Sequence, residues 1–136
     1  MIDCLILGDS IAVGTHQFKQ ECVAYAKGGI NTHQWNNKYR HENLTAKTAI
    51  ISLGTNDHKH VKTLVELNFM RGRVKADRVY WIMPPCNSKF CKPEINKWVE
   101  EVAKEWGDQI ISTQKLQADA IHPSWSGYKE LANSVK

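Results

Sequence analysis

The chain has 136 residues, the length of a single domain. Its hydrophobic content of 42% and charged content of 24% are those of ordinary globular proteins, which excludes disordered and collagen-like classes. The formal net charge is +4, but the basic residues are scattered and do not indicate nucleic-acid binding. No apolar run approaches the roughly 20 residues that cross a bilayer. We therefore expect one domain over residues 1–136 that does not insert into a membrane.

Five short apolar runs predict the strands of a sheet. In chain order they cover residues 4–7, 22–26, 49–53, 78–83 and 109–112. They are rich in Ile, Val and Leu and do not alternate with polar residues, which is typical of strands covered on both faces. The first run lacks the basic flank of a secretion signal, so we interpret it as a strand. The protein is thus expected to be cytoplasmic, unless an export signal was removed or the protein is released by lysis.

Amphipathic segments between these runs predict helices. They cover residues 11–20, 59–75, 93–106 and 124–136, and a short helix is expected around Trp35 in the irregular stretch 30–44. Alternating strands and helices within one domain predict an α/β fold, in which a parallel sheet lies between two helix layers. The functional crevice of such a fold lies at the carboxyl ends of its strands.

The four cysteines fall into two groups. Cys4 and Cys22 lie in apolar strand-like runs, where we expect inert core thiols. Cys86 and Cys91 flank a four-residue segment, and an oxidising compartment would allow a local disulfide between them. Their spacing is not that of a usual zinc site.

Glycines and polar residues follow several of the predicted strands. The segments are Gly8-Asp9-Ser10 after the first strand, Lys27-Gly28-Gly29 after the second, Gly54-Thr55-Asn56-Asp57 after the third and, beyond the fifth, Asp119-Ala120-Ile121-His122-Pro123. Because the carboxyl ends of parallel strands share one edge of the sheet, we expect these segments to converge.

The residue types in these segments suit acyl transfer. Ser10 is a nucleophile that needs an adjacent base, and the imidazole of His122 suits that task. Asp119, three residues earlier, can hold the imidazole in the required tautomer. The backbone N–H groups of Ser10 and Gly29 and the side-chain amide of Asn56 can together bind a developing oxyanion.

At these residues the chain resembles the SGNH (GDSL-like) hydrolase superfamily, whose four sequence blocks it matches in order. The resemblance implies a flavodoxin-like three-layer α/β/α sandwich, and we predict a five-stranded parallel sheet in the order 2-1-3-4-5. It also implies metal-free hydrolysis of carboxylic esters through an acyl-enzyme, without a cofactor. The triad would then be Ser10, Asp119 and His122, with Asn56 as an oxyanion donor.

The match to the second block of the family does not decide whether Gly28 or Gly29 is the oxyanion donor, because the two glycines are adjacent. We favour Gly29, since Ile30 and Thr32 then follow in the family manner.

The chain is short for the family, which predicts an open, shallow site and a small acyl group, such as acetyl, on a carbohydrate. Trp35, His58 and Trp125 lie near the matched blocks and are candidates for substrate binding. His58 and His60 form an H-x-H pair in a predicted loop, and we expect no metal site there. Two alternatives stay open: a lipid or thioester hydrolase, and a non-catalytic carbohydrate-binding module on the same fold. The oligomeric state is not indicated.

Overall fold

A parallel sheet of five strands forms the centre of the computed structural model, which describes residues 2–86, 91–113, 116–117, 119 and 121–135. The strands are β1 (Ile2–Gly8), β2 (Val23–Ala26), β3 (Thr45–Ser52), β4 (Lys75–Ile82) and β5 (Gln109–Ile111). Their order is β2-β1-β3-β4-β5, and every neighbouring pair is parallel. The predicted α/β fold and strand order are confirmed.

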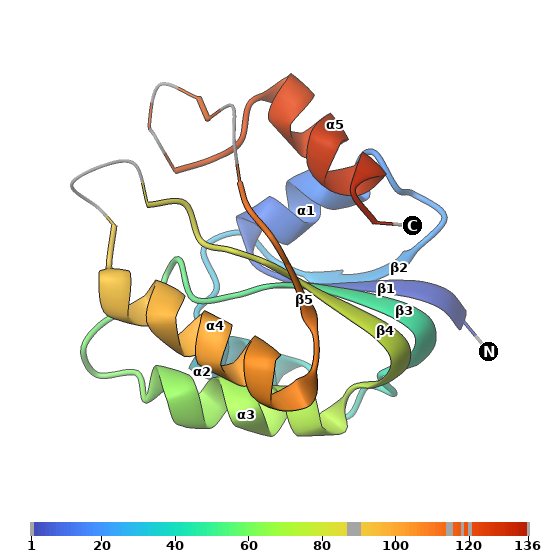
Figure 1. Cartoon of the computed structure of the whole chain (residues 1–136). Coiled ribbons are helices and arrows are strands. Elements are labelled where there is room, and N and C mark those ends of the chain that lie inside the picture. The colour runs from blue at the N-terminus through green and yellow to red at the C-terminus, as the bar shows by residue number, and fades with distance from the viewer. Residues whose placement is uncertain (1, 87–90, 114–115, 118, 120, 136) are drawn as a thin grey trace.

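Two helix layers cover the sheet (Figure 1). One layer consists of α1 (Ser10–His16) and α5 (Trp125–Asn133), and the other of α2 (Thr32–Lys38), α3 (Thr63–Arg73) and α4 (Pro93–Trp106). The helix expected around Trp35 is α2, and α4 has the predicted bounds. Helices α1 and α3 are shorter than predicted, because a turn closed by Cys22 N–H on the Lys19 carbonyl follows α1 and a loop precedes α3.

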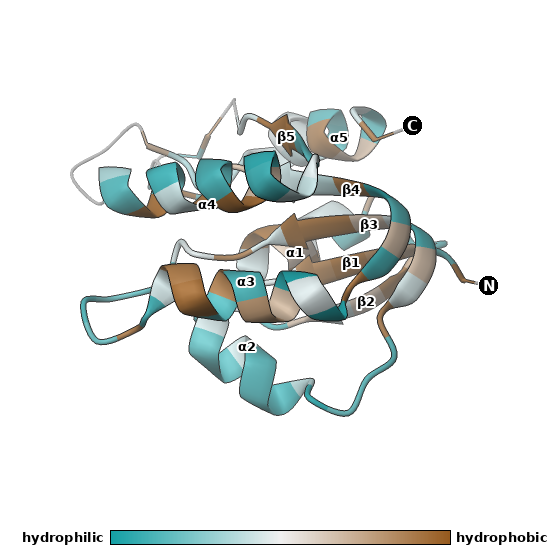
Figure 2. Ribbon diagram, turned by 60° about the horizontal axis from the view of Figure 1, so that its bottom comes forward, coloured by the Kyte–Doolittle hydropathy of each residue, from teal (hydrophilic) through white to brown (hydrophobic). Residues whose placement is uncertain are grey.

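Side chains of β1 alternate between two hydrophobic clusters, one on each face of the sheet. Leu5 and Leu7 pack with residues of α2, α3 and α4, whereas Cys4 and Ile6 pack with residues of α1 and α5. Both faces are therefore apolar, which explains why the strand sequences show no polar alternation. Figure 2 shows the strands in hydrophobic colours and hydrophilic segments on the outer helices.

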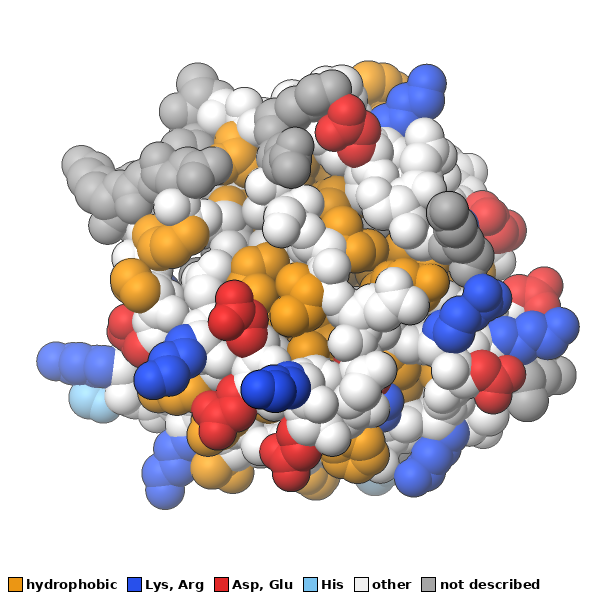
Figure 3. Space-filling view, viewed as in Figure 1, with side chains coloured by type: hydrophobic (Ala, Val, Ile, Leu, Met, Phe, Trp, Pro, Cys, Tyr) orange, Lys and Arg blue, Asp and Glu red, His pale blue; other side chains and the backbone are white. Residues whose placement is uncertain are grey.

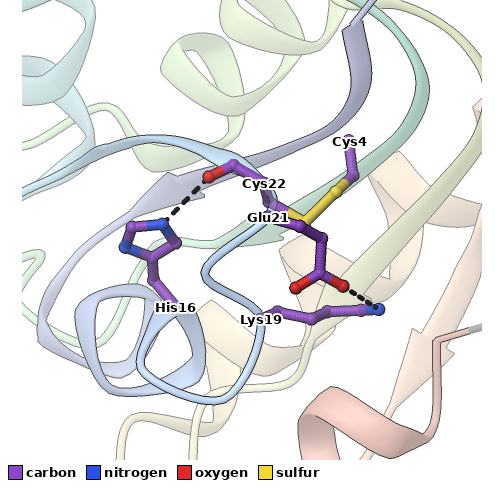
Figure 4. Close-up of a disulfide and its surroundings, with 5 residues drawn as sticks. All are labelled: Cys4, His16, Lys19, Glu21 and Cys22. Carbon is purple, nitrogen blue, oxygen red and sulfur yellow. Dashed lines mark hydrogen bonds and ion pairs between the residues drawn. A yellow bond between two sulfur atoms is a disulfide. The ribbon is translucent and has the colours of Figure 1, made fainter.

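Both cysteine pairs are disulfide-bonded, so the expectation of free core thiols at Cys4 and Cys22 is wrong. Cys4 in β1 is bonded to Cys22, with their Cα atoms 4.7 Å apart (Figure 4). The register pairs Leu5 with Val23, so the residues one step earlier face each other across the β1–β2 pair. Cys86 and Cys91 form the second disulfide.

Charged side chains of both signs are mixed on the face shown in Figure 3. Two of the basic residues near the end of α3 are engaged within the fold: Arg71 pairs with Asp108 at 2.6 Å, and Arg73 donates to the carbonyls of Tyr39 and Glu42. In the part of the chain that the structure describes, no helix is both long enough and apolar enough to cross a bilayer.

Candidate active site

Ser10 is the first residue of α1, directly after the turn that ends β1. The turn is held by Asp9, whose backbone N–H donates to the Ser52 carbonyl (2.9 Å) and whose carboxylate accepts the Ile11 N–H (3.0 Å) and the Ser52 hydroxyl (3.0 Å). Asp9 is fully buried, and its Oδ2 atom has no hydrogen-bond partner among the described residues. Burial raises the pKa of Asp9 to about 7. The hydrogen bonds to its carboxylate act in the opposite direction and lower the pKa, but their effect is smaller.

The loop that carries Asp119 and His122 is brought to Ser10 by the packing of α5 on α1. Gly14 in α1 faces the ring of Tyr128 in α5, and any side chain at position 14 would collide with that ring. The loop is fixed at its base by Gln117, whose backbone N–H donates to the His122 carbonyl (2.7 Å) and whose side-chain amide donates to the Pro123 carbonyl (2.9 Å). The side chain of His122, which follows Ser10 by 112 residues in the sequence, thereby reaches the start of α1.

Ser10, His122 and Asp119 form a continuous hydrogen-bonded chain. The Ser10 Oγ lies 2.8 Å from the His122 Nε2, and the His122 Nδ1 lies 2.7 Å from the Asp119 Oδ2. The other Asp119 oxygen accepts the backbone N–H groups of Ile121 and His122 at 2.9 and 3.0 Å. The hydrogen bond from His122, followed by these two N–H groups, lowers the pKa of Asp119 to about 2.

This arrangement can move a proton from a serine hydroxyl to an imidazole whose other nitrogen is held by an ionised carboxylate. The His122 and Asp119 side chains are 36% and 43% exposed, so these two residues lie at the surface, while Ser10 is half-buried.

The glycine segment after β2 lies beside Ser10. A Cβ atom built on Gly28 would stand 3.8 Å from the Ser10 Cβ, whereas Gly29 has a φ of 79° and open space around it. A positive φ of this size favours glycine, which explains the residue type at position 29. Asn56 is tied to the same segment, because its Nδ2 donates to the Ile30 carbonyl at 3.1 Å.

The three candidates for substrate binding have different surroundings. Trp35 is fully buried and donates to the Tyr25 carbonyl at 2.9 Å, so the expectation that it lines a pocket is corrected. Trp125 is 73% exposed and packs edge-on against Phe18, with ring centroids 4.7 Å apart. His58 borders a cavity of about 380 Å³ on the other face of the sheet.

That cavity is lined by side chains of α2 and the residue before it, of the loop before α3 and of α3 itself. They include Asn31, His33, His58, His60 and Glu66. The His33 Nδ1 lies 2.7 Å from a Glu66 oxygen, and the His58 and His60 rings meet edge-on at 5.8 Å. Among the described residues, no group of three or more His, Cys, Asp or Glu is arranged to hold a metal ion.

Sequence reasoning missed Phe18 as a neighbour of Trp125. Nothing near residue 18 in the sequence indicates this contact, because it depends on how α5 packs on α1.

The chain matches no family model and no curated protein sequence. Its structure is similar to solved structures that share little sequence identity with it. A protein of the G-D-S-L family from Desulfitobacterium hafniense has a TM-score of 0.70 and 16% identity, over 98% of this chain and 97% of the other. The acetylxylan esterase Axe2 from Geobacillus stearothermophilus has a TM-score of 0.71 and 16% identity, over 97% and 91% of the two chains. The catalytic domain of the peptidoglycan O-acetyltransferase OatA from Streptococcus pneumoniae has a TM-score of 0.63 and 17% identity, over 98% and 89%.

These similarities define the fold of the chain, which is that of the SGNH/GDSL-like hydrolases. The resemblance found in the sequence blocks is thus confirmed at the level of the fold.

Proposed function

We propose that this protein is a serine ester hydrolase that works through an acyl-enzyme. The observation that carries the proposal is the hydrogen-bonded chain from Ser10 through His122 to Asp119. His122 takes the Ser10 proton as the hydroxyl attacks the acyl carbon, and returns that proton to the leaving alcohol. A water then attacks the acyl-enzyme, with His122 acting again as the base, which releases the acid and restores Ser10.

The oxyanion that forms in each step is assigned to three donors. The Ser10 N–H lies at the start of α1, and the second donor is the N–H of Gly29, with Gly28 as the alternative. The third is the Asn56 side-chain amide. One hydrogen of the Asn56 Nδ2 is used on the Ile30 carbonyl, and the amide carries a second hydrogen for the oxyanion. Losing one such donor typically costs about 10²–10³-fold in kcat.

We further propose that the substrate is a small acyl group, such as acetyl, on a carbohydrate. Two surface features of the described residues support this class. Trp125 with Phe18 presents an exposed aromatic surface on the α1/α5 side, and a sugar ring can stack on such a surface. The cavity at His58, on the opposite side of the sheet, is bordered by several side chains that can bind hydroxyls, such as those of His60 and Lys62.

Two of the structural neighbours support the same class. One is an acetylxylan esterase and another is a peptidoglycan O-acetyltransferase.

The test is hydrolysis of p-nitrophenyl acetate, butyrate and octanoate by the wild type and by Ser10→Ala. We expect turnover to fall with chain length and to be lost in the variant. Faster turnover of octanoate than of acetate would favour a lipid hydrolase, and fast turnover of an acyl thioester would favour a thioesterase. No turnover of any ester, together with unchanged polysaccharide binding in Ser10→Ala, would favour the binding module.

The carbohydrate is tested with an acetylated xylo-oligosaccharide. We expect Trp125→Ala to raise KM for this substrate while kcat/KM for p-nitrophenyl acetate stays unchanged. Trp106→Ala is the matched control, because Trp106 is also exposed (45%) but lies at the far end of α4, over Arg71. Equal KM values in the two variants would count against the aromatic surface as a sugar site.

A further inference from the structure

Two of the three proposed oxyanion donors come from separate loops, and their relative position is not set by the sheet alone. Gly29 lies in the loop between β2 and α2, whereas Asn56 lies in the loop between β3 and α3. The strands β2 and β3 are not neighbours, because β1 separates them. Direct contacts between the loops must therefore hold the donors at a fixed separation.

Asp57 supplies such a contact through its side chain. Its carboxylate is fully buried and accepts the backbone N–H of Thr32 at 2.8 Å. The Thr32 hydroxyl lies 3.0 and 2.9 Å from the two carboxylate oxygens, and the Thr63 hydroxyl lies 2.7 Å from one of them. The carboxylate thus joins the end of the Gly29 loop to the start of α3.

Asn56, the residue before Asp57, contacts the same segment as a hydrogen-bond donor, whereas Asp57 contacts it as an acceptor. The Asn56 Nδ2 donates to the Ile30 carbonyl, next to Gly29, while Asp57 accepts from Thr32 two residues further on. The consecutive residues Asn56 and Asp57 therefore both contact the segment that follows Gly29, at Ile30 and at Thr32. From the residue before α4, the Lys92 Nζ donates to the Asp57 carbonyl at 2.5 Å, which fixes the backbone that carries both side chains.

We propose that Asp57 is the positioning residue of the oxyanion hole: its carboxylate sets the distance between the Gly29 N–H and the Asn56 amide. This inference rests on the proposed hydrolase function. Asp57 does not touch the reacting atoms, and it acts through the two donors.

The first test compares two substitutions that each remove one hydroxyl from the same carboxylate. Thr32→Val removes the hydroxyl at the start of α2, directly after the Gly29 loop, and Thr63→Val removes the one at the start of α3. Both threonines are buried (0% and 2% exposed) and valine keeps their shape, so the losses in packing are matched. We expect kcat for p-nitrophenyl acetate to fall about tenfold in Thr32→Val and to stay within about twofold in Thr63→Val, with KM unchanged in both. Equal kcat values in the two variants would overturn the inference.

The second test uses Asp57→Asn, which keeps the size of the side chain but places an NH₂ donor opposite hydroxyl donors. We expect kcat to fall about 10²-fold with KM unchanged, because a displaced donor weakens binding of the transition state and not of the substrate. A kcat within twofold of the wild type would show that Asp57 does not position the hole.

Nuclear magnetic resonance reports the geometry without substrate. The Gly29 backbone amide and the Asn56 side-chain amide are expected to shift or broaden in Asp57→Asn and to stay unchanged in Thr63→Val. Unchanged signals in Asp57→Asn would overturn the inference even in an active enzyme. A wild type that turns over no ester, yet shows these changes in its Asp57→Asn variant, would refute the proposed function and support the positioning by Asp57.

Discussion

The disulfide between Cys4 and Cys22 is expected to be a major part of the stability of this fold. The double variant Cys4→Ala/Cys22→Ala removes a cross-link between residues 18 apart in the sequence. Loop-closure entropy for a ring of that size gives a loss of about 3 kcal/mol in the free energy of unfolding. For a chain of 136 residues, an unfolding entropy of about 2.1 cal/mol/K per residue converts this loss into a Tm lower by about 11 °C.

The assay is thermal and urea unfolding followed by circular dichroism in the absence of reductant. The matched control is Cys86→Ala/Cys91→Ala, whose cross-link joins residues only 5 apart. The same calculation gives about 2 kcal/mol for that control, hence a drop of about 7 °C. Free thiols in the unfolded, unreduced wild type, or a Tm unchanged by Cys4→Ala/Cys22→Ala, would refute the reasoning.

Three further predictions concern the site. Asp119→Asn should lower kcat by about 10²–10⁴-fold in p-nitrophenyl acetate hydrolysis, because an amide does not stabilise the imidazolium of His122; an unchanged kcat would remove Asp119 from the triad. Asn56→Ala should lower kcat by about 10²–10³-fold with little change in KM, and a loss confined to KM would contradict its role as an oxyanion donor. Asp9→Asn should alter how stability depends on pH.

The sign of that last effect follows from the burial of Asp9. Its pKa is raised from 3.8 to about 7 in the folded protein, so between these values the folded state holds a proton that the unfolded state has released. Stability of the wild type should therefore fall as the pH rises from about 4 to about 7, by up to about 4 kcal/mol. Urea unfolding at several pH values should show this slope in the wild type and a shallower one in Asp9→Asn. Parallel curves for the two proteins would show that Asp9 does not titrate in this range.

The parallel sheet and the meeting of Ser10 with His122 could be predicted from the sequence because they follow from simple rules, whereas the strand order was predicted with the fold that the family resemblance implies. Apolar runs covered on both faces indicate a parallel sheet, and the carboxyl ends of its strands lie at one edge. The spacing of Asp119 and His122 is local, so the contact between them is also readable from the sequence.

The features that could not be predicted depend on packing between elements. The Cys4–Cys22 bond requires the register of β1 against β2, which the apolar runs alone do not fix. Trp35 and Trp125 look alike in the sequence, yet Trp35 is buried under Tyr25 and Tyr39 while Trp125 lies at the surface. A short helix with few apolar residues does not show which of its faces meets the core.

The most direct measurement is covalent labelling of the protein with a serine-directed sulfonyl fluoride, followed by peptide mass spectrometry. We predict one adduct per chain on Ser10, loss of ester hydrolysis in step with labelling, and strongly slowed labelling in His122→Ala. An active protein that stays unlabelled at Ser10, or that loses activity through an adduct elsewhere, would contradict Ser10 as the nucleophile.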